Sequence, residues 1–361
     1  MKKHPILRSL AMAAMAVLLL AACPNTQQSQ GGSPLQTASA FTQIVAFGDA
    51  YSDSGTFNPS TGDGDPANDR QVGHAETTSA SGTWTSYAAA KLGLALTSDR
   101  RVDFGAVGLG GGIKSLGGTN YAEGGARIEI EPANNGVAMQ RVPRLGVVAV
   151  QGPTSRSIRS QIDAYEREHD GRFDRSQLVL IQGGANDFLA FIERAARDPA
   201  YAATSQTFVG KTASGMLGQI WRLRKAGATH IVYANLPDLG MTPKYRGTPE
   251  AAIASSMCAQ YNSVMAAALA GSGVQVFDTA ALFSNMIAMP ASYGLANVTA
   301  PACRTVRPGE ASGLSTLRCS EKTLVASGAD QYYMFADLIR PSSRVHEIWG
   351  ARVAQMVLNP S

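Results

Sequence analysis

The feature that most constrains the fold is an alternation of short apolar runs with longer stretches of helical periodicity. The apolar runs, each followed at once by small or polar residues, are Ile44–Phe47, Leu178–Ile181, Ile231–Ala234 and Val274–Phe277. Helical spacing of apolar residues occurs in Ser157–Glu168, Phe188–Arg197, Thr207–Ala226 and Pro249–Leu269. Strands that alternate with helices predict a single-domain, three-layer α/β/α sandwich with a mainly parallel sheet. In such a sheet the chemistry gathers beyond the carboxyl ends of the strands.

Composition supports one globular domain over residues 41–361. Apolar residues make up 45% of the 361 residues and charged residues 16%, which excludes wholesale disorder. We find no internal repeat and no change of composition after residue 41. The segment Thr56–Ser81, rich in Gly, Asp, Asn and Thr, is expected to be a long loop that forms a lip over the site.

The first 22 residues are typical of a secretory signal peptide. Lys2, Lys3 and Arg8 precede Ser9–Ala22, which is uncharged and apolar after its first residue. This stretch ends in Leu20-Ala21-Ala22-Cys23, which resembles the lipobox of bacterial lipoproteins. The resemblance implies cleavage before Cys23 and a lipid on its thiol. The alternative is a plain signal peptide followed by an unrelated Cys.

Residues 23–40 are then expected to be the lipidated Cys and a flexible tether. Residues 24–40 are uncharged and rich in Gln, Ser and Gly. Pro24 stands where lipoproteins kept in the inner membrane have Asp, which favours the outer membrane. We therefore expect a lipid-anchored protein of the bacterial cell envelope, facing an oxidising space.

The other three cysteines fit that compartment. Cys303 and Cys319 bracket a loop rich in Pro, Gly, Ser and Thr, and we expect a disulfide between them. A closed loop of that size stabilises a fold by about 3 kcal/mol in the chain-entropy model. Cys258 is expected to be a buried apolar residue of a helix. The Cys spacing matches no zinc pattern, and nothing in the sequence requires a metal or another cofactor.

Charge excludes several partners. The net charge is +4, and the signal peptide carries three of those charges, so the remainder is near +1. We expect no nucleic acid partner, and no apolar run is long enough for a membrane-spanning helix. The glycine-rich stretch 108–115 has Ile113 where a phosphate loop needs its last Gly, so we interpret it as a flexible loop.

Five motifs, in order, resemble those of the GDSL esterase/lipase family, the SGNH hydrolases. They are Phe47-Gly48-Asp49-Ala50-Tyr51-Ser52-Asp53-Ser54-Gly55, Asn120-Tyr121-Ala122-Glu123-Gly124-Gly125-Ala126, Gly184-Ala185-Asn186-Asp187, Asn235-Leu236-Pro237-Asp238-Leu239-Gly240 and Phe335-Ala336-Asp337-Leu338-Ile339-Arg340-Pro341. Each motif alone is weak. Their order over some three hundred residues makes the resemblance specific.

The resemblance implies acyl transfer by a serine at the end of the first strand. In the family a His takes the serine proton, an Asp three residues before it orients the His, and Gly and Asn donors hold the oxyanion. Carried over residue by residue, the oxyanion donors are Gly125 and Asn186, and the orienting carboxylate is Asp337. Taken alone, Asn186 suits a turn and Gly125 a special backbone conformation.

Two positions depart from the family pattern. The nucleophile position holds Ala50, which has no attacking oxygen, and the base position holds Arg340, whose guanidinium cannot accept a proton. The sequence predicts instead an ion pair between Asp337 and Arg340. Replacement catalysis would need Ser52 or Ser54 with His346, which is expected on the terminal helix.

Three functions remain open. The first is a catalytically degenerate envelope lipoprotein that keeps the oxyanion donors and binds an acyl ester, a lipid or an acetylated glycan. The second is an active carboxylic-ester hydrolase, an esterase or lipase with another nucleophile. The third is a structural lipoprotein whose partner surfaces are the loops at Thr56–Ser81 and Gly105–Gly118. The three tryptophans are scattered in the sequence, and we expect core or lip roles for them rather than a sugar platform.

Overall fold

The computed structural model describes residues 41–58, 75–78, 82–103, 105–106, 113–131, 137–142, 146–151, 155–304, 316, 319, 321 and 323–359. The predicted signal peptide at 1–22 and the predicted tether at 23–40, with Cys23, therefore lie outside the described residues. So do parts of the segments 56–81 and 105–118.

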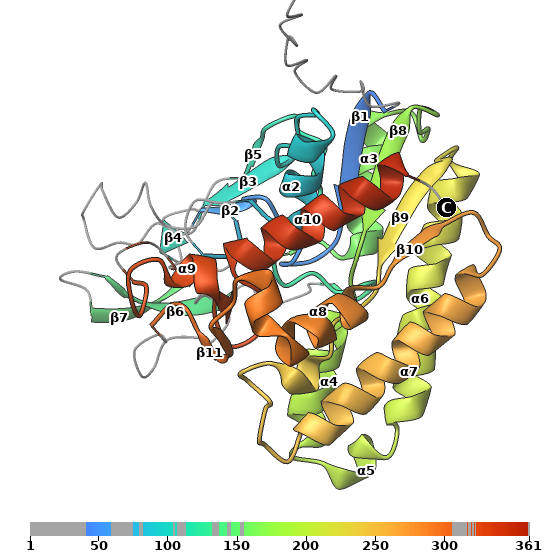
Figure 1. Cartoon of the computed structure of the whole chain (residues 1–361). Coiled ribbons are helices and arrows are strands. Elements are labelled where there is room, and N and C mark those ends of the chain that lie inside the picture. Colours follow the sequence, from blue (N-terminus) through green and yellow to red (C-terminus); the bar gives the residue numbers. More distant parts are fainter. Residues whose placement is uncertain are drawn as a thin grey trace, which may run out of the picture. The chain divides into compact units, whose positions relative to one another are not determined.

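Four parallel strands form the central sheet. They are, in spatial order, β1 (Gln43–Phe47), β8 (Gln177–Ile181), β9 (His230–Ala234) and β10 (Gln275–Phe277) (Figure 1). Phe47 pairs with Ile181 and Ile181 with Tyr233, so β1, β8 and β9 end at one edge of the sheet. All five residues of β8 are buried, as continuous apolar runs predict for a sheet covered on both faces. These strands are the four predicted apolar runs, and the expected fold class is confirmed.

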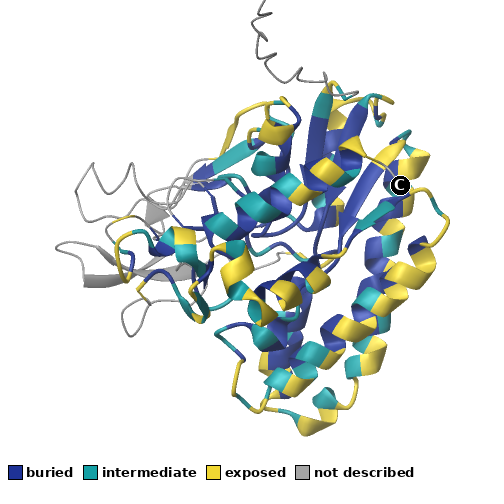
Figure 2. Cartoon of the chain, viewed as in Figure 1, coloured by how far each residue is buried: buried dark blue, intermediate teal, exposed yellow. Residues whose placement is uncertain are grey.

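Helices cover both faces of the sheet. The crossovers from β1 to β8, β9 and β10 all step in one direction, so right-handed connections put their helices on the same face. Those helices are α3 (Ile158–Glu168), α6 (Ser205–Lys225) and α7 (Ala251–Leu269), with α4 (Ala185–Ala195) and α5 (Pro199–Ala202) preceding α6. On the other face, α10 (Ser343–Leu358) packs against α2 (Trp84–Lys91) (Figure 1). Figure 2 shows a buried sheet and helices exposed only on their outer sides.

Smaller elements surround this core. Two three-stranded sheets have the orders β2-β3-β5 and β4-β7-β6, and β11 pairs with β12. Their bounds are β2 (Phe57–Asn58), β3 (Arg100–Asp103), β4 (Gly105–Ala106), β5 (Ile113–Ser115), β6 (Val137–Val142), β7 (Gly146–Gln151), β11 (Asn297–Pro301) and β12 (Tyr333–Phe335). The remaining helices are α8 (Thr279–Ala288), α9 (Ala329–Tyr332), η1 (Leu239–Met241) and η2 (Pro290–Tyr293).

The glycine-rich segment 105–118 corrects one prediction. It was expected to be a loop, but both of its described ends contain strands. Gly105 and Ala106 pair with β7, and residues 113–115 pair antiparallel with β3. The strand at 113–115 contains no glycine and begins with Ile113, which favours strands, while Gly105 is held in a strand by pairing to β7.

Two of the three tryptophans meet in the core, although they are far apart in the sequence. Trp84 on α2 and Trp349 on α10 are fully buried, with parallel rings 5.0 Å apart. The edge of Phe283 packs against Trp349. Trp221 is exposed on α6, with the Arg224 guanidinium 5.9 Å from its ring centre. The core role expected for Trp84 and Trp349 is confirmed.

Cys258, Cys303 and Cys319 are arranged as predicted. Cys303 and Cys319 form a disulfide with a Cα–Cα distance of 5.7 Å, beside a small apolar cluster that includes Ala302 and Leu324. Cys258 is a buried thiol on α7, and burial raises its pKa to about 12.

Within the residues that the structure describes, no helix combines the length and the apolar character needed to cross a bilayer.

Gly350 sets the distance between α10 and α2. A Cβ there would lie 2.5 Å from the Trp84 carbonyl oxygen and 2.6 Å from the Tyr87 Cβ. We expect Gly350→Ala to lower the free energy of unfolding by about 1–3 kcal/mol in urea titrations, because two helix backbones must separate. The control is Gly210→Ala on α6, where no atom lies within 4 Å of the new Cβ. This change should stabilise the protein by about 0.5–1 kcal/mol, and equal effects of the two changes would contradict the close packing.

Candidate active site

The turn after β1 carries Ala50. Gln161 of α3 fixes its start, because its side-chain amide accepts from the Gly48 N–H and donates to the Gly48 carbonyl, both at 2.9 Å. The Asp49 carbonyl then accepts from Ser52 and Asp53, and Asp49 Oδ1 accepts the Tyr51 N–H at 3.0 Å. These bonds hold Ala50, which is buried, just past the end of β1.

The segment 119–126 runs beside β1 and brings Gly125 to the same end. Ala46 donates to the Thr119 carbonyl at 3.0 Å, and Glu123 donates to the Gly48 carbonyl at 3.1 Å. Gly125 has a φ of 81°, a left-handed conformation that favours glycine. The segment therefore continues the sheet edge and then turns sharply at Gly125.

Asn186 reaches this turn from the neighbouring strand. It lies in the first turn of α4, directly after β8, and its Nδ2 donates to the Ala126 carbonyl at 2.9 Å. Asp187 Oδ2 accepts the Ile128 N–H at 3.1 Å. Gly125 and Asn186, which were predicted from separate motifs, are thus brought together.

Three N–H donors at this point have no acceptor among the described residues. They are the backbone N–H groups of Ala50 and Gly125 and the second N–H of Asn186 Nδ2. The Ala50 N–H was not predicted, because a search for side-chain chemistry passes over the backbone of an alanine. Unpaired donors of this kind, gathered at a strand end, can polarise a carbonyl oxygen.

The predicted ion pair between Asp337 and Arg340 is confirmed. The turn that follows β12 directs the N–H groups of Ile339 and Arg340 to Asp337 Oδ1, at 2.8 and 2.6 Å. Arg340 Nη1 lies 2.8 Å from Asp337 Oδ2. The Tyr51 hydroxyl donates to the Ile339 carbonyl at 3.3 Å and so connects this turn to the one that carries Ala50.

Glu76 is the site residue that sequence reasoning missed. Its Oε2 lies 2.9 Å from Arg340 Nε, and the two side chains are only 4% and 11% exposed. Thr316, inside the disulfide loop, also donates to Glu76 Oε2, at 2.6 Å. Nothing in the sequence distinguished Glu76 from other acids of a polar loop, because its partners are far along the chain.

The described part of the loop around Glu76 is bonded to the end of the chain. The Thr77 hydroxyl donates to the Pro341 carbonyl at 3.0 Å, and Ser343 N–H donates to Thr78 Oγ1 at 2.9 Å. Glu76 also lies against the second motif, since a Cβ on Gly124 would collide with Glu76 Oε1. A lip over the site was predicted at Thr56–Ser81, and residues 75–78 of it do contact the site.

Burial dominates the electrostatics of the site. It raises the pKa of Asp49 and of Asp53 to about 7 and that of Asp187 to about 6. Burial alone would lower the pKa of Arg340, but the charges of Glu76 and Asp337 outweigh it and raise the pKa above the usual range. Arg340 therefore stays protonated and cannot act as a base.

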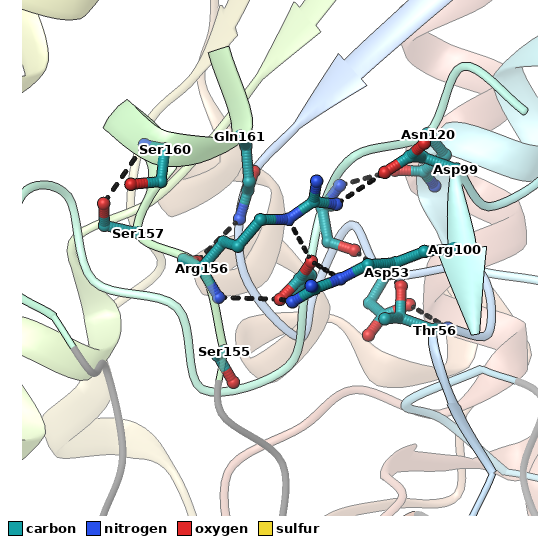
Figure 3. Close-up of polar contacts among 12 residues, drawn as sticks. Asp53, Thr56, Asp99, Arg100, Asn120, Ser155, Arg156, Ser157, Ser160 and Gln161 are labelled. Carbon is teal, nitrogen blue, oxygen red and sulfur yellow. Dashed lines mark hydrogen bonds and ion pairs between the residues drawn. The ribbon is translucent and has the colours of Figure 1, made fainter. Parts of the chain in front are cut away.

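A second buried ion cluster supports the Gly124–Gly125 turn. Arg100 on β3 and Arg156 before α3 approach the Glu123 carboxylate from opposite sides (Figure 3). Arg156 also pairs with Asp99 at 2.7 Å. Glu123 Oε1 lies 2.7 Å from Arg100 Nε and 2.6 Å from Arg156 Nε. Two cations and two anions balance, so the cluster can be buried without a net charge.

Among the described residues, Ser52, Ser54 and His346 do not form a replacement triad. Ser52 Oγ accepts from Trp84 Nε1 at 3.1 Å, and Ser54 Oγ lies 3.2 Å from Ser98 Oγ. His346 is on α10 as predicted, but its Nδ1 accepts the Trp84 N–H at 3.1 Å and its ring stacks on Trp349. Burial lowers the His346 pKa to about 3. Neither serine hydrogen-bonds to His346.

Comparisons with known proteins agree with these motifs. Residues 44–353 match the family model described as GDSL-like Lipase/Acylhydrolase. The chain is 26% identical over 212 residues to Lipase 1 of Photorhabdus luminescens, an alignment that covers 59% of this chain and 25% of the relative. It is 31% identical over 135 residues to Phosphatidylcholine-sterol acyltransferase of Aeromonas hydrophila, covering 36% and 37%. The chain thus spans between a quarter and two fifths of these relatives.

Solved structures align over most of the chain at low identity. Phospholipase A1 from Streptomyces albidoflavus NA297 aligns with 87% of this chain and 98% of its own, at 14% identity and a TM-score of 0.42. The aryl esterase of M. Smegmatis aligns with 88% and 98%, at 14% identity and a TM-score of 0.37.

The raised pKa of Asp49 gives a stability test. The folded state holds its proton up to about pH 7 and the unfolded chain only to about pH 4, so the stability that Asp49 contributes is lost as the pH rises between these values. Asp49→Asn keeps an acceptor for the Tyr51 N–H but cannot ionise. We expect the variant to gain stability over the wild type by at most about 1.4 kcal/mol per pH unit from pH 4 to 7.

Urea titrations at pH 5, 6 and 7 measure this difference. Glu193→Gln, at a 66% exposed carboxylate, controls for the loss of an acid. A stability difference between Asp49→Asn and the wild type that does not change with pH would show that Asp49 ionises in the folded protein as it does in water.

Proposed function

The chain belongs to the GDSL-like lipase/acylhydrolase family, and we propose that it is a non-hydrolytic member that binds an acyl carbonyl at the carboxyl end of β1 and β8. One observation carries the proposal. The three N–H donors of Ala50, Gly125 and Asn186 have no acceptor among the described residues, while Ala50 has no nucleophilic oxygen. The site can therefore hold a carbonyl oxygen but cannot attack its carbon through Ala50.

Arg340 gives a second reason to expect no turnover. A serine triad needs a group that takes the hydroxyl proton, and a guanidinium held between two carboxylates does not accept one. Loss of a triad member costs on the order of 10⁶ in turnover, and oxyanion donors alone leave about 10³–10⁴ over water. The remaining donors then serve binding.

The ligand we propose is an acyl compound of the cell envelope: an acyl ester, a lipid or an acetylated glycan. The family is one of acylhydrolases, and the named relatives are a lipase and an acyltransferase, both of which handle acyl groups. The near-neutral charge of the chain after the signal peptide also suits an uncharged ligand better than a polyanion.

We further propose that Cys23 carries a lipid that anchors the domain to the outer membrane. Lys2, Lys3 and Arg8, the apolar stretch Ser9–Ala22 and the Leu20–Cys23 motif support this, and the uncharged residues 24–40 would act as the tether.

Lipid labelling tests the anchor. In a bacterium that processes lipoproteins, the wild type should incorporate labelled palmitate and sediment with outer membranes. Cys23→Ser should lose both properties, because its hydroxyl does not replace the thiol. Cys258→Ser, at a buried thiol, is the control and should keep the label. Labelled Cys23→Ser protein would contradict the anchor.

Ester hydrolysis tests the loss of catalysis. We expect the full chain to hydrolyse phenyl butyrate no faster than heat-unfolded protein, while intact ester binds in ligand-observed NMR. Binding should fall at least about tenfold in Asn186→Ala and persist in Asn285→Ala, a change on α8. Turnover that disappears in Ser52→Ala or Ser54→Ala would establish the active esterase instead. Absence of any Asn186-dependent binding would favour the structural role.

Restoring the missing groups tests the scaffold. We expect Ala50→Ser, Arg340→His and Glu76→Gln together to raise phenyl butyrate hydrolysis at least about 100-fold over the wild type. The third change avoids leaving the Glu76 carboxylate buried without its cation. Ala50→Ser alone, which keeps Arg340, is the control and should stay near the wild type. Adding Asp337→Asn to the triple variant should remove most of the gain.

A further inference from the structure

Glu76 presents an unused hydrogen-bond acceptor beside the oxyanion donors. Its Oε2 is occupied by Arg340 and Thr316, whereas no donor among the described residues bonds to its Oε1. Oε1 packs on Gly124, the residue before the Gly125 donor. The side chain is only 4% exposed, so the unused oxygen has little contact with bulk water.

Because Oε1 contacts the residue before the Gly125 donor, it can reach an atom bonded to the carbonyl carbon of a ligand that Gly125 and Asn186 hold. In an ester the atom bonded to the carbonyl carbon is an oxygen, whose lone pairs repel a carboxylate. In a secondary amide that atom is a nitrogen, whose N–H can donate to the carboxylate. We propose that this site selects N-acyl amides over the corresponding esters, with Glu76 Oε1 as the acceptor. The proposal rests on the proposed function, because it names the ligand class of the same site.

The charge of the site also disfavours a free carboxylic acid. Arg340 contacts both Glu76 and Asp337, and these three groups together carry one net negative charge when both acids are ionised. A carboxylate ligand would add a second buried negative charge beside them. A neutral amide has a carbonyl oxygen that accepts from the N–H groups of the site and an N–H that donates to Glu76, so the donors and the acceptor are both paired.

Glu76 is held in place before any ligand arrives. Arg340 and Thr316 fix its Oε2, and the bonds of Thr77 to Pro341 and of Ser343 to Thr78 fix the backbone on its C-terminal side. Because an acceptor that is already ordered loses little entropy on binding, its hydrogen bond can contribute fully to selectivity.

A matched pair of ligands tests the proposal. Butyranilide and phenyl butyrate share one skeleton and differ only by N–H in place of oxygen. We expect the full wild-type chain to bind the amide at least about tenfold more tightly than the ester, as measured by ligand-observed NMR titration. Equal affinities, or tighter binding of the ester, would overturn the proposal without any variant.

Glu76→Gln supplies the second measurement. Its carbonyl oxygen can face the Arg340 guanidinium, which leaves the NH₂ group toward the ligand and turns the acceptor into a donor. We expect the preference to fall to parity or to reverse toward the ester. Glu193→Gln, at an exposed glutamate, should keep the preference of the wild type. An unchanged preference in folded Glu76→Gln would overturn the role of Glu76.

The outcomes separate this proposal from the one it rests on. If both ligands bind equally and Asn186→Ala weakens both, the acyl-binding function stands and amide selection fails. If neither ligand binds, both proposals fail. If phenyl butyrate is hydrolysed during the titration, the non-hydrolytic function fails, while butyranilide binding to the wild type and to Glu76→Gln still decides the role of Glu76.

Discussion

The arrangement of the site depends on one buried cation. Arg340 lies between Asp337, three residues before it, and Glu76, from a distant loop. Each group alone would be costly to bury, and together they leave a small net charge with directed hydrogen bonds. Through Glu76 this cluster contacts the Gly124–Gly125 turn, and through Ile339 and Tyr51 it is connected to the turn that holds Ala50. The turn that holds Arg340 is thus connected to the loop at Glu76, to the Gly124–Gly125 turn and to the turn at Ala50, which lie far apart in the sequence.

Arginine and alanine at these two positions are physically consistent with each other. A histidine at position 340 could bond to Asp337 through one ring nitrogen, but without a serine its other nitrogen would have no hydroxyl to deprotonate. A guanidinium uses the Asp337 carboxylate fully, because two groups of opposite charge meet at 2.8 Å. Because a guanidinium cannot accept a proton, one residue accounts both for the ion pair with Asp337 and for the lack of a base at position 340.

The sequence predicted the elements whose signals are local. The four strands are continuous apolar runs, the oxyanion residues lie in short motifs at strand ends, and Asp337 is near Arg340 in the chain. Contacts between distant segments were missed for the same reason: Glu76 with Arg340, and Trp84 with Trp349. No periodicity relates such residues, and only the folded sheet and its helices bring them together. The Ala50 N–H was missed because every residue except proline has a backbone N–H, so the sequence does not single out one of them as a donor.

Unpaired donors and buried acids at the end of a sheet carry a cost in stability. Asp49 and Asp53 bind protons more tightly in the folded protein than in water, which means that their ionised forms disfavour folding at neutral pH. The same carboxylates accept the N–H groups of Tyr51, Thr56 and Gly124, so they hold the turns of the site at that cost. Proteins break such local rules mainly where function demands it. We therefore propose that the unpaired N–H groups beside an oriented carboxylate serve ligand binding and are not unused remains of catalysis.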